Sequence, residues 1–227
     1  MLLGELSSTL IPEMVTIPAG VLLQKDDRKR ERWTAQVQSF DTSKYLVTQA
    51  LYASVLNERP SQFTGDDLPV DSVSWFDAVR FCNGLSERYG LKPYYLEHGD
   101  GLVDRCAISD GYRLLTDAEW EYACRAGSQG PHYGALEDIG WFAENSAGTP
   151  QAVGCKEPNE FGLYDMLGNV WEWCWDLYDP AVYGEYRVFK GGGWADDERG
   201  CLVTNRRRSH PTFRVEDLGF RVARSIK

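Results

Sequence analysis

Side-chain oxygens that could bind a cation are concentrated in residues 161–173, which read Phe-Gly-Leu-Tyr-Asp-Met-Leu-Gly-Asn-Val-Trp-Glu-Trp. Asp165, Asn169 and Glu172 follow one another closely there, and calcium takes carboxylate and backbone carbonyl oxygens together. The stretch therefore predicts a site for a hard cation. The plainer alternative is that the two carboxylates accept hydrogen bonds from backbone amides. If the end of the stretch is a strand, Trp171 and Trp173 point to one face and Glu172 to the other.

Thiols and imidazoles show no spacing typical of a metal site or a catalytic triad. No two of the six cysteines form a Cys-x-x-Cys pair, so in a reducing compartment most of them are expected to be small buried hydrophobic residues. The three histidines are too far apart in the sequence to suggest a metal triad. The cysteines are Cys82, Cys106, Cys124, Cys155, Cys174 and Cys201, and the histidines are His98, His132 and His210.

The helices that must support these residues are marked by capping signals. Ser74 and Asp77, and later Thr116 and Glu119, form Ser/Thr-x-x-acid capping boxes, each followed by apolar residues at helical spacing. We expect these two main helices to end near Gly90 and Gly127. Thr48 offers its hydroxyl as an N-cap for a shorter helix at 49–57.

The other segments predict short strands and loops. Strands are expected at 14–23 and 34–45, a solvated charged run or hairpin tip at 24–33, an irregular hairpin at 92–111 and a long ordered loop at 128–160. The pattern predicts one loop-rich α+β domain with two main helices and many short strands. We place an N-terminal arm at 1–13 and the domain at 14–227.

Composition narrows the classes of partner. The chain has 227 residues, of which 43% are hydrophobic and 13% aromatic, enough for one sizeable core. A formal net charge of −10 disfavours nucleic acids and anionic membranes as partners, because long-range repulsion opposes both. No apolar run approaches the ~18 residues of a membrane span, and the first residues lack the basic start of a signal peptide. Cytoplasmic residence is therefore the default expectation.

Residues 162–173 resemble the signature of the formylglycine-generating-enzyme (sulfatase-modifying factor) family, whose fold is a variant of the C-type lectin fold. Segments at 14–20, 69–78, 113–123, 190–194 and 218–223 are also similar to family segments and occur in family order. The resemblance implies a formylglycine-generating-enzyme-like, C-type-lectin-like fold. It does not imply one function, because this fold carries oxidases, other enzymes and binding proteins.

The resemblance also implies a calcium ligand set. In the family a calcium ion is held by the side chain that precedes the Met/Ile position, two backbone carbonyls and the glutamate between the tryptophans. At the matching positions of this chain stand Asp165, Gly168, Val170 and Glu172. We expect calcium here, with backbone-amide capping as the alternative.

Copper chemistry is the second activity that the resemblance raises. Formylglycine-generating enzymes bind copper(I) through two cysteines separated by four residues, and soft thiolates select that metal. The second position matches Cys201, whereas the first is Asp196, a hard carboxylate. We therefore expect copper not to bind and the chain not to be an oxidase. If it were one, Cys201 would be its catalytic residue.

A third implication concerns the C-terminal segment. Some proteins of this fold family are variable proteins of diversity-generating retroelements, whose segment between the Gly-Gly-Ser-Trp and Gly-Phe-Arg motifs is the ligand-binding surface. The segment 190–221 is the counterpart here. It is rich in the aromatic and arginine residues that supply most interface energy. The candidate ligand-binding residues are Trp194, Asp196, Asp197, Arg199, Asn205, Arg207, Arg208, His210 and Phe213.

Two functions remain open on the sequence. The first is a module that binds a protein or other macromolecular ligand through residues 190–221. The alternative is an oxygen- and copper-dependent formylglycine-generating oxidase that acts on a cysteine of a sulfatase-like protein. An ordinary family loop that binds nothing is the plain reading of the same segment.

Overall fold

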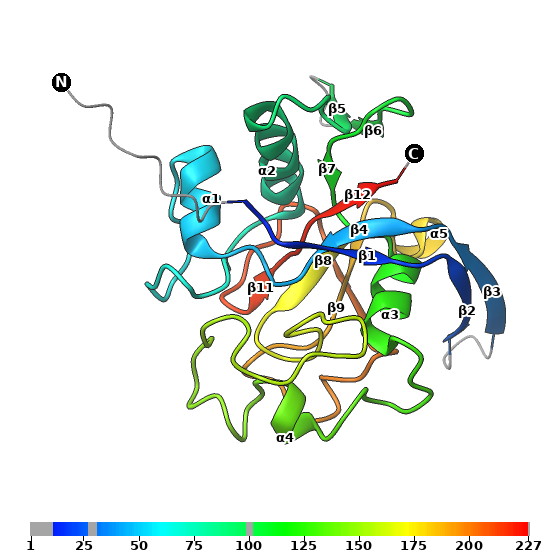
Figure 1. Cartoon of the computed structure of the whole chain (residues 1–227), viewed down its shortest axis with the longest axis vertical. Coiled ribbons are helices and arrows are strands. Elements are labelled where there is room, and N and C mark those ends of the chain that lie inside the picture. The colour runs from blue at the N-terminus through cyan, green and yellow to red at the C-terminus, as the bar shows by residue number, and fades with distance from the viewer. Residues whose placement is uncertain (1–10, 27–30, 99–101, 227) are drawn as a thin grey trace.

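The computed structural model describes residues 11–26, 31–98 and 102–226. It is an α+β domain with several small sheets, as predicted (Figure 1). A third main helix joins the two that the capping boxes predict. The helices are α1 (Gln49–Leu56), α2 (Trp75–Arg88) and α3 (Asp117–Arg125), with the short α4 (Leu136–Ile139) and α5 (Pro180–Tyr183). No helix in these residues is long and apolar enough to cross a membrane.

Two four-stranded sheets form the centre. In the first, with the order β1-β4-β12-β7, the last strand of the chain lies between two earlier ones and runs antiparallel to both. Its strands are β1 (Met14–Ile17), β4 (Phe40–Ser43), β7 (Tyr112–Arg113) and β12 (Ala223–Ser225). The second sheet has the order β10-β9-β8-β11. Its strands are β8 (Trp171–Leu177), β9 (Arg187–Lys190), β10 (Arg206–Ser209) and β11 (Leu218–Gly219).

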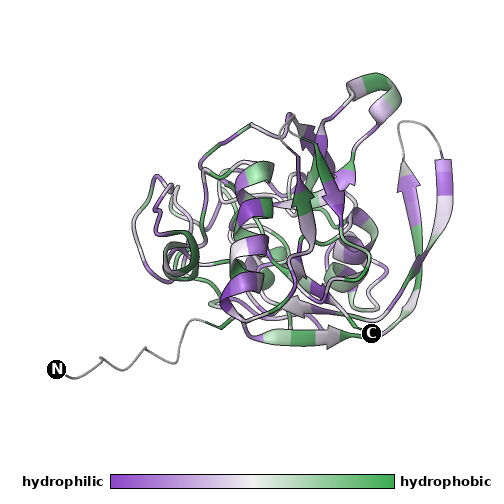
Figure 2. Cartoon of the chain, turned by 90° about the horizontal axis from the view of Figure 1, so that it is seen from above, coloured by the Kyte–Doolittle hydropathy of each residue, from purple (hydrophilic) through white to green (hydrophobic). Residues whose placement is uncertain are grey.

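Two hairpins complete the fold. The predicted strands 14–23 and 34–45 are each divided in two, and their outer halves pair as the hairpin of β2 (Gly20–Asp26) and β3 (Glu31–Val37). This hairpin stands away from the body (Figure 2). Part of the run 24–33, predicted to be a solvated loop or hairpin tip, forms strands of this hairpin, and Gln24 is buried. Residues 27–30 lie outside the described part of the chain. The second hairpin, predicted within 92–111, consists of β5 (Tyr95–Glu97) and β6 (Val103–Arg105). Of the predicted arm 1–13, residues 1–10 lie outside the described residues.

The helix starts follow the local chemistry that the sequence shows. Ser74 and Thr116 each accept a hydrogen bond from the backbone amide three residues on, and the acidic residue at that position bonds back. Thr48 accepts from Leu51 N and caps α1. Gly90 takes the left-handed conformation expected after α2, and after α3 that conformation already begins at Ala126. The capping predictions are confirmed.

The predicted placement of Trp171 and Trp173 on one face of the strand and Glu172 on the other is confirmed as well. Trp171 and Trp173 are buried on one face of β8, where both rings contact Phe189 edge-on, with centroid separations of 5.3 Å. Glu172 is equally buried but takes part in a charged contact rather than an aromatic one. The central strand therefore separates an aromatic core from a buried ionic one.

The signature stretch also orders the long loop 128–160. Asn169 exchanges two hydrogen bonds with the backbone of Gln151, and Asp165 accepts one from Gly154 N at 2.7 Å. Asn159 donates to the carbonyls that end α3. Side chains of the signature thus satisfy backbone groups that the loop itself leaves open.

A glycine pair tests how closely the signature is packed. Gly168 has φ +80°, and an added Cβ would lie 2.3 Å from Trp141 O, whereas Gly162 has φ +79° with nothing within 4 Å. Gly162→Ala should cost about 1–2 kcal/mol for the left-handed backbone. Gly168→Ala should cost about 3–4 kcal/mol, because overpacking adds to that cost. Urea unfolding of both variants measures the difference, and equal losses would contradict the close contact.

Candidate functional site

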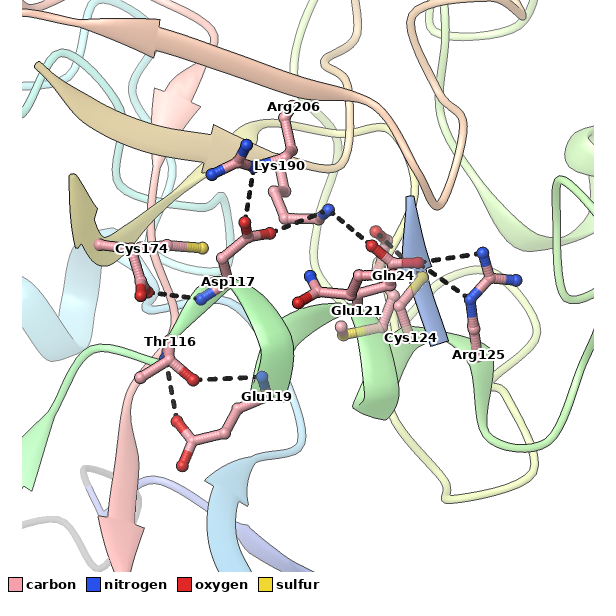
Figure 3. A network of polar contacts seen from close by, with 12 residues as sticks. Gln24, Thr116, Asp117, Glu119, Glu121, Cys124, Arg125, Cys174, Lys190 and Arg206 are labelled. Atoms are coloured by element: carbon pink, nitrogen blue, oxygen red, sulfur yellow. Dashed lines mark hydrogen bonds and ion pairs between the residues drawn. The ribbon is translucent and has the colours of Figure 1, made fainter. Parts of the chain in front are cut away.

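The segment 190–221 begins in a buried charge cluster against α3. Lys190 has a fully buried side chain whose Nζ lies 3.1 Å from Asp117 Oδ1 and 3.2 Å from Glu121 Oε2 (Figure 3). Burial alone would lower the pKa of Lys190, but the two carboxylates raise it above its ordinary value. Arg206 pairs with Asp117, and Arg125 with Glu121. The start of the segment is therefore an anchor and not a binding surface.

Asp196 ties the middle of the segment to the signature strand. Its Oδ2 accepts from Trp171 Nε1 at 2.6 Å and from Gly193 N at 3.0 Å, while Oδ1 lies 3.0 Å from Arg207 Nη2. The Arg207 guanidinium also lies 4.5 Å from the Trp171 ring centroid. Gly200 packs against Asp196 so closely that a Cβ would meet its side chain at 2.4 Å. The carboxylate at the first copper position thus holds the loop together.

Cys201, at the second copper position, is a buried thiol. Its Sγ lies against Gly192, where an added Cβ would approach it to 2.6 Å. Burial, Asp196 and Asp197 raise the pKa of Cys201 to about 12, so the thiolate that binds copper is disfavoured. A carboxylate engaged by protein donors and a protonated thiol do not fit copper(I).

The three arginines of β10 do not form one patch. Opposite residues of an antiparallel pair share a face, and β10 alternates. Arg207 lies over Trp171, whereas Arg208 lies on the other side, with its guanidinium 4.8 Å and 3.8 Å from the ring centroids of Tyr178 and Tyr183. Arg206 is 4.7 Å from the Tyr178 centroid and ion-paired with Asp117. An acidic partner could therefore not meet all three at once.

The remaining predicted ligand-binding residues divide into exposed and anchored ones. Asp197, Arg199 and Phe213 are exposed, as is Arg207. Trp194 is partly buried against Phe63 and donates to Glu216 O, and Asn205 donates to the carbonyls of Arg199 and Gly200. His210 lies between Thr212 Oγ1 at 2.7 Å and Glu185 Oε1 at 2.6 Å.

The two carboxylates predicted to bind calcium already form bonds with other groups of the protein. Glu172 forms a bidentate pair with Arg221, at 2.7 Å to Nε and 3.0 Å to Nη2, and both side chains are buried. Asp165 accepts from the backbone amide of Gly154, as in the capping alternative, and also from the side-chain amide of Asn169. Gly168 and Val170 are buried. Among the described residues no group of three or more His, Cys, Asp or Glu is placed to hold a metal ion.

This donor set does not fit a cation, because the Arg221 guanidinium already supplies positive charge to Glu172. It also donates to backbone carbonyls of residues 43, 44, 164 and 165. Calcium binding stays a prediction of the resemblance. Sequence reasoning missed Arg221 as a partner of Glu172, since 49 residues separate them and no local pattern joins them.

The fold agrees with comparisons to known proteins. The model of the FGE-sulfatase family, described as the sulfatase-modifying factor enzyme 1-like domain, matches residues 2–226. The chain belongs to this family. The solved structure of Treponema denticola variable protein 1 superposes with a TM-score of 0.88 at 30% identity, covering 93% of this chain and 94% of that one.

Two further proteins to which the chain is similar carry different functional names. "Chaperone protein LppX" of Paenibacillus barcinonensis is 28% identical over 257 residues, covering 96% of this chain and 91% of that protein. "Inactive C-alpha-formylglycine-generating enzyme 2" of Mus musculus is 32% identical over 177 residues, covering 69% of this chain and 56% of that protein. Membership therefore does not decide between catalysis and binding.

The Arg221–Glu172 pair gives a stability prediction. Arg221→Gln should cost about 3–5 kcal/mol, because it leaves a buried carboxylate without its cation. Glu172→Gln should cost a similar amount, and the double variant less than the sum. Arg59→Gln, which removes an exposed pair with Asp66, is the control and should change stability by less than about 1 kcal/mol. Urea unfolding gives the four values.

The same proteins test the calcium prediction. We expect the melting temperature to be equal in calcium and in chelator, since the guanidinium occupies both oxygens of Glu172. A calcium-induced rise that disappears in Glu172→Gln would show that the metal displaces Arg221, and our account of the site would be wrong.

Proposed function

We propose that this domain is a binding module that presents the exposed middle of residues 190–221 to a protein or other macromolecular ligand. The observation that carries the proposal is the position of Asp196. At the place where an oxidase of this family needs a thiolate, its carboxylate bonds to Trp171 and Arg207 and fixes the loop. Likeness to a variable protein over nearly the whole chain supports the same function.

The burial pattern of the segment suits display. Residues 190–193, 200, 201 and 203 are buried, as are 218–223, so the frame is held at both ends and in the middle. Between these anchors Asp197, Arg199, Arg207 and Phe213 are exposed. Such side chains can change without loss of the core, because exposed positions contribute little to stability. Binding residues are commonly carried on loops that a rigid scaffold positions.

Two expectations belong to this proposal. A nucleic acid is disfavoured as the ligand, because the net charge of −10 would repel a phosphate backbone. Cytoplasmic residence stays a prediction.

The copper-dependent oxidase is the alternative, favoured only by the match at Cys201. Anaerobic titration with copper(I) separates the two functions, and we expect no tight thiolate-dependent complex with the native chain. Asp196→Cys restores two thiols and serves as the positive control, since two soft ligands select copper(I). Tight binding to the native chain that is lost in Cys201→Ser would favour the oxidase.

If residues 190–221 form the ligand-binding surface, binding should depend on the exposed residues of this segment. Peptides can be selected from a random phage-displayed library on the immobilised native domain. Arg199→Ala with Phe213→Ala should abolish their binding and shift the melting temperature by no more than about 2 °C. These two residues are cleaner probes than Arg207 and His210, which are ion-paired with Asp196 and Glu185.

A matched control changes one arginine and one apolar residue elsewhere. Arg32→Ala with Leu23→Ala alters exposed positions on the β2–β3 hairpin and should leave peptide binding unchanged. If the selected peptides bind the Arg199/Phe213 variant as well as the native domain, the segment is not the binding surface.

A further inference from the structure

Arg187, at the start of β9, lies against two neighbouring indole rings. Its guanidinium carbon lies 3.9 Å from the centroid of Trp75 and 5.0 Å from that of Trp175. One nitrogen, Nη1, donates to the backbone carbonyl of Trp175 at 2.7 Å. The side chain is partly exposed, so this cation–π stack fixes the guanidinium at a surface that solvent or a ligand can reach.

Among the described residues, Arg187 shares with the partly buried Arg208 and Arg224 the lack of an ion pair with a carboxylate, whereas four other partly or fully buried arginines have one. Within the described residues it has no ion pair, and its buried Nε has no hydrogen-bond partner. A buried donor without an acceptor costs free energy and calls for a reason. The ion-paired examples are Arg113 with Glu119, Arg125 with Glu121, Arg206 with Asp117 and Arg221 with Glu172.

Two acids, Asp176 and Glu185, interact with Arg187 through space, but the contacts they form are with other groups. Asp176 accepts a hydrogen bond from Asp117 N, and burial raises its pKa to about 6. Glu185 pairs with His210 at 2.6 Å. A second cation stands nearby, since the exposed Arg105 of β6 lies 5.7 Å from the centroid of the same Trp175 ring.

The surroundings of Arg187 suit a peptide more than a small inorganic anion. By strand register Leu177, Arg187 and Ser209 lie in one row across the sheet and share a face. Leu177 is 38% exposed and the adjacent Tyr186 is 37% exposed, so an apolar rim borders the cation. A carboxylate next to an aliphatic side chain would satisfy both features.

The domain contains its own example of the completed arrangement. The Arg207 guanidinium lies 4.5 Å from the Trp171 ring centroid, and Asp196 Oδ1 pairs with it at 3.0 Å. Arg207 and Arg187 lie on the same face of the second sheet, because their cross-strand partners are Phe189 and Ser209, two residues apart on each strand. The Arg187 stack has the cation and the indoles but not the acid.

We propose that Arg187 is a carboxylate-binding subsite that takes an Asp or Glu side chain of an acidic peptide segment, with Arg105, which lies near the same indole ring, as a second cation. The inference rests on the proposed binding function and names the chemical class of the ligand. It extends the binding surface from residues 190–221 to β9, the end of β8 and the β5–β6 hairpin.

The test compares two synthetic pentapeptides, Glu-Leu-Glu-Leu-Glu and Gln-Leu-Gln-Leu-Gln, with acetylated and amidated ends. Binding is followed by tryptophan fluorescence, because Trp75 and Trp175 lie in the subsite, and by calorimetry. We expect the glutamate peptide to bind the native domain and the glutamine peptide to bind at least about tenfold more weakly, as loss of a charged hydrogen-bonded pair requires. Absence of binding by the glutamate peptide, or equal binding of both, overturns the proposal.

Variants locate the subsite. Arg187→Gln should weaken binding of the glutamate peptide about tenfold, and Arg187→Lys less, because lysine keeps the charge but loses the planar fork. Arg105→Gln changes an exposed residue, so it should weaken binding without a folding defect even if Arg187→Gln is unstable. Arg224→Gln is the matched control: Arg224 also donates to a backbone carbonyl and lies over an aromatic ring, that of Tyr112, and its loss should leave binding unchanged.

The outcomes separate this inference from the proposed function. If Arg187→Gln and Arg105→Gln bind the glutamate peptide like the native domain, the subsite is wrong, whereas the library peptides still report on residues 190–221. Inorganic phosphate is added as a competitor of the glutamate peptide. If phosphate at the same concentration as the peptide displaces it fully, the site binds anions in general and the peptide assignment is wrong.

Discussion

The buried guanidinium of Arg221 is the interaction on which the rest of the domain depends. It neutralises Glu172 of the signature strand and donates to carbonyls at the end of β4 and within the first part of the signature. A buried charge is tolerated only when paired and fully hydrogen-bonded. The early strand, the signature and the C-terminal end of the chain must therefore meet in one geometry, which closes the fold.

That closure has a consequence for the segment between β9 and β11. Lys190 is fixed against α3 at its start and Arg221 just beyond its end, each by buried carboxylates. Asp196 adds a third attachment, to Trp171 of the same central strand. The backbone of the segment is thereby determined by residues that face inward, and its outward side chains are free to serve recognition. Catalysis by a thiolate pair would need a cysteine at the inward position that Asp196 occupies.

Local chemistry could be predicted from the sequence, and long-range pairing could not. The capping boxes at Ser74 and Thr116 satisfy helix amides within three residues, so the sequence contains all the information they need. The alternation around Glu172 is equally local. By contrast, the partner of Glu172 is 49 residues away, and the bond between Trp171 and Asp196 spans 25. The three arginines 206–208 are consecutive in the sequence, but strand alternation divides them between two faces of the sheet.

Electrostatics also explains why recognition here must be short-range. A domain of net charge −10 repels an acidic partner within about a Debye length, roughly 8 Å, of its surface, and beyond that distance salt screens the charge, so its charge does not steer such a partner toward it. Affinity then has to come from contacts that form only on docking: guanidinium groups fixed on indoles, and apolar rims that exclude water. A partner with scattered acids would meet the repulsion without these gains. Only a ligand with a carboxylate at the fixed arginine, next to an apolar residue, gains enough on contact to offset the repulsion, and that requirement confers specificity.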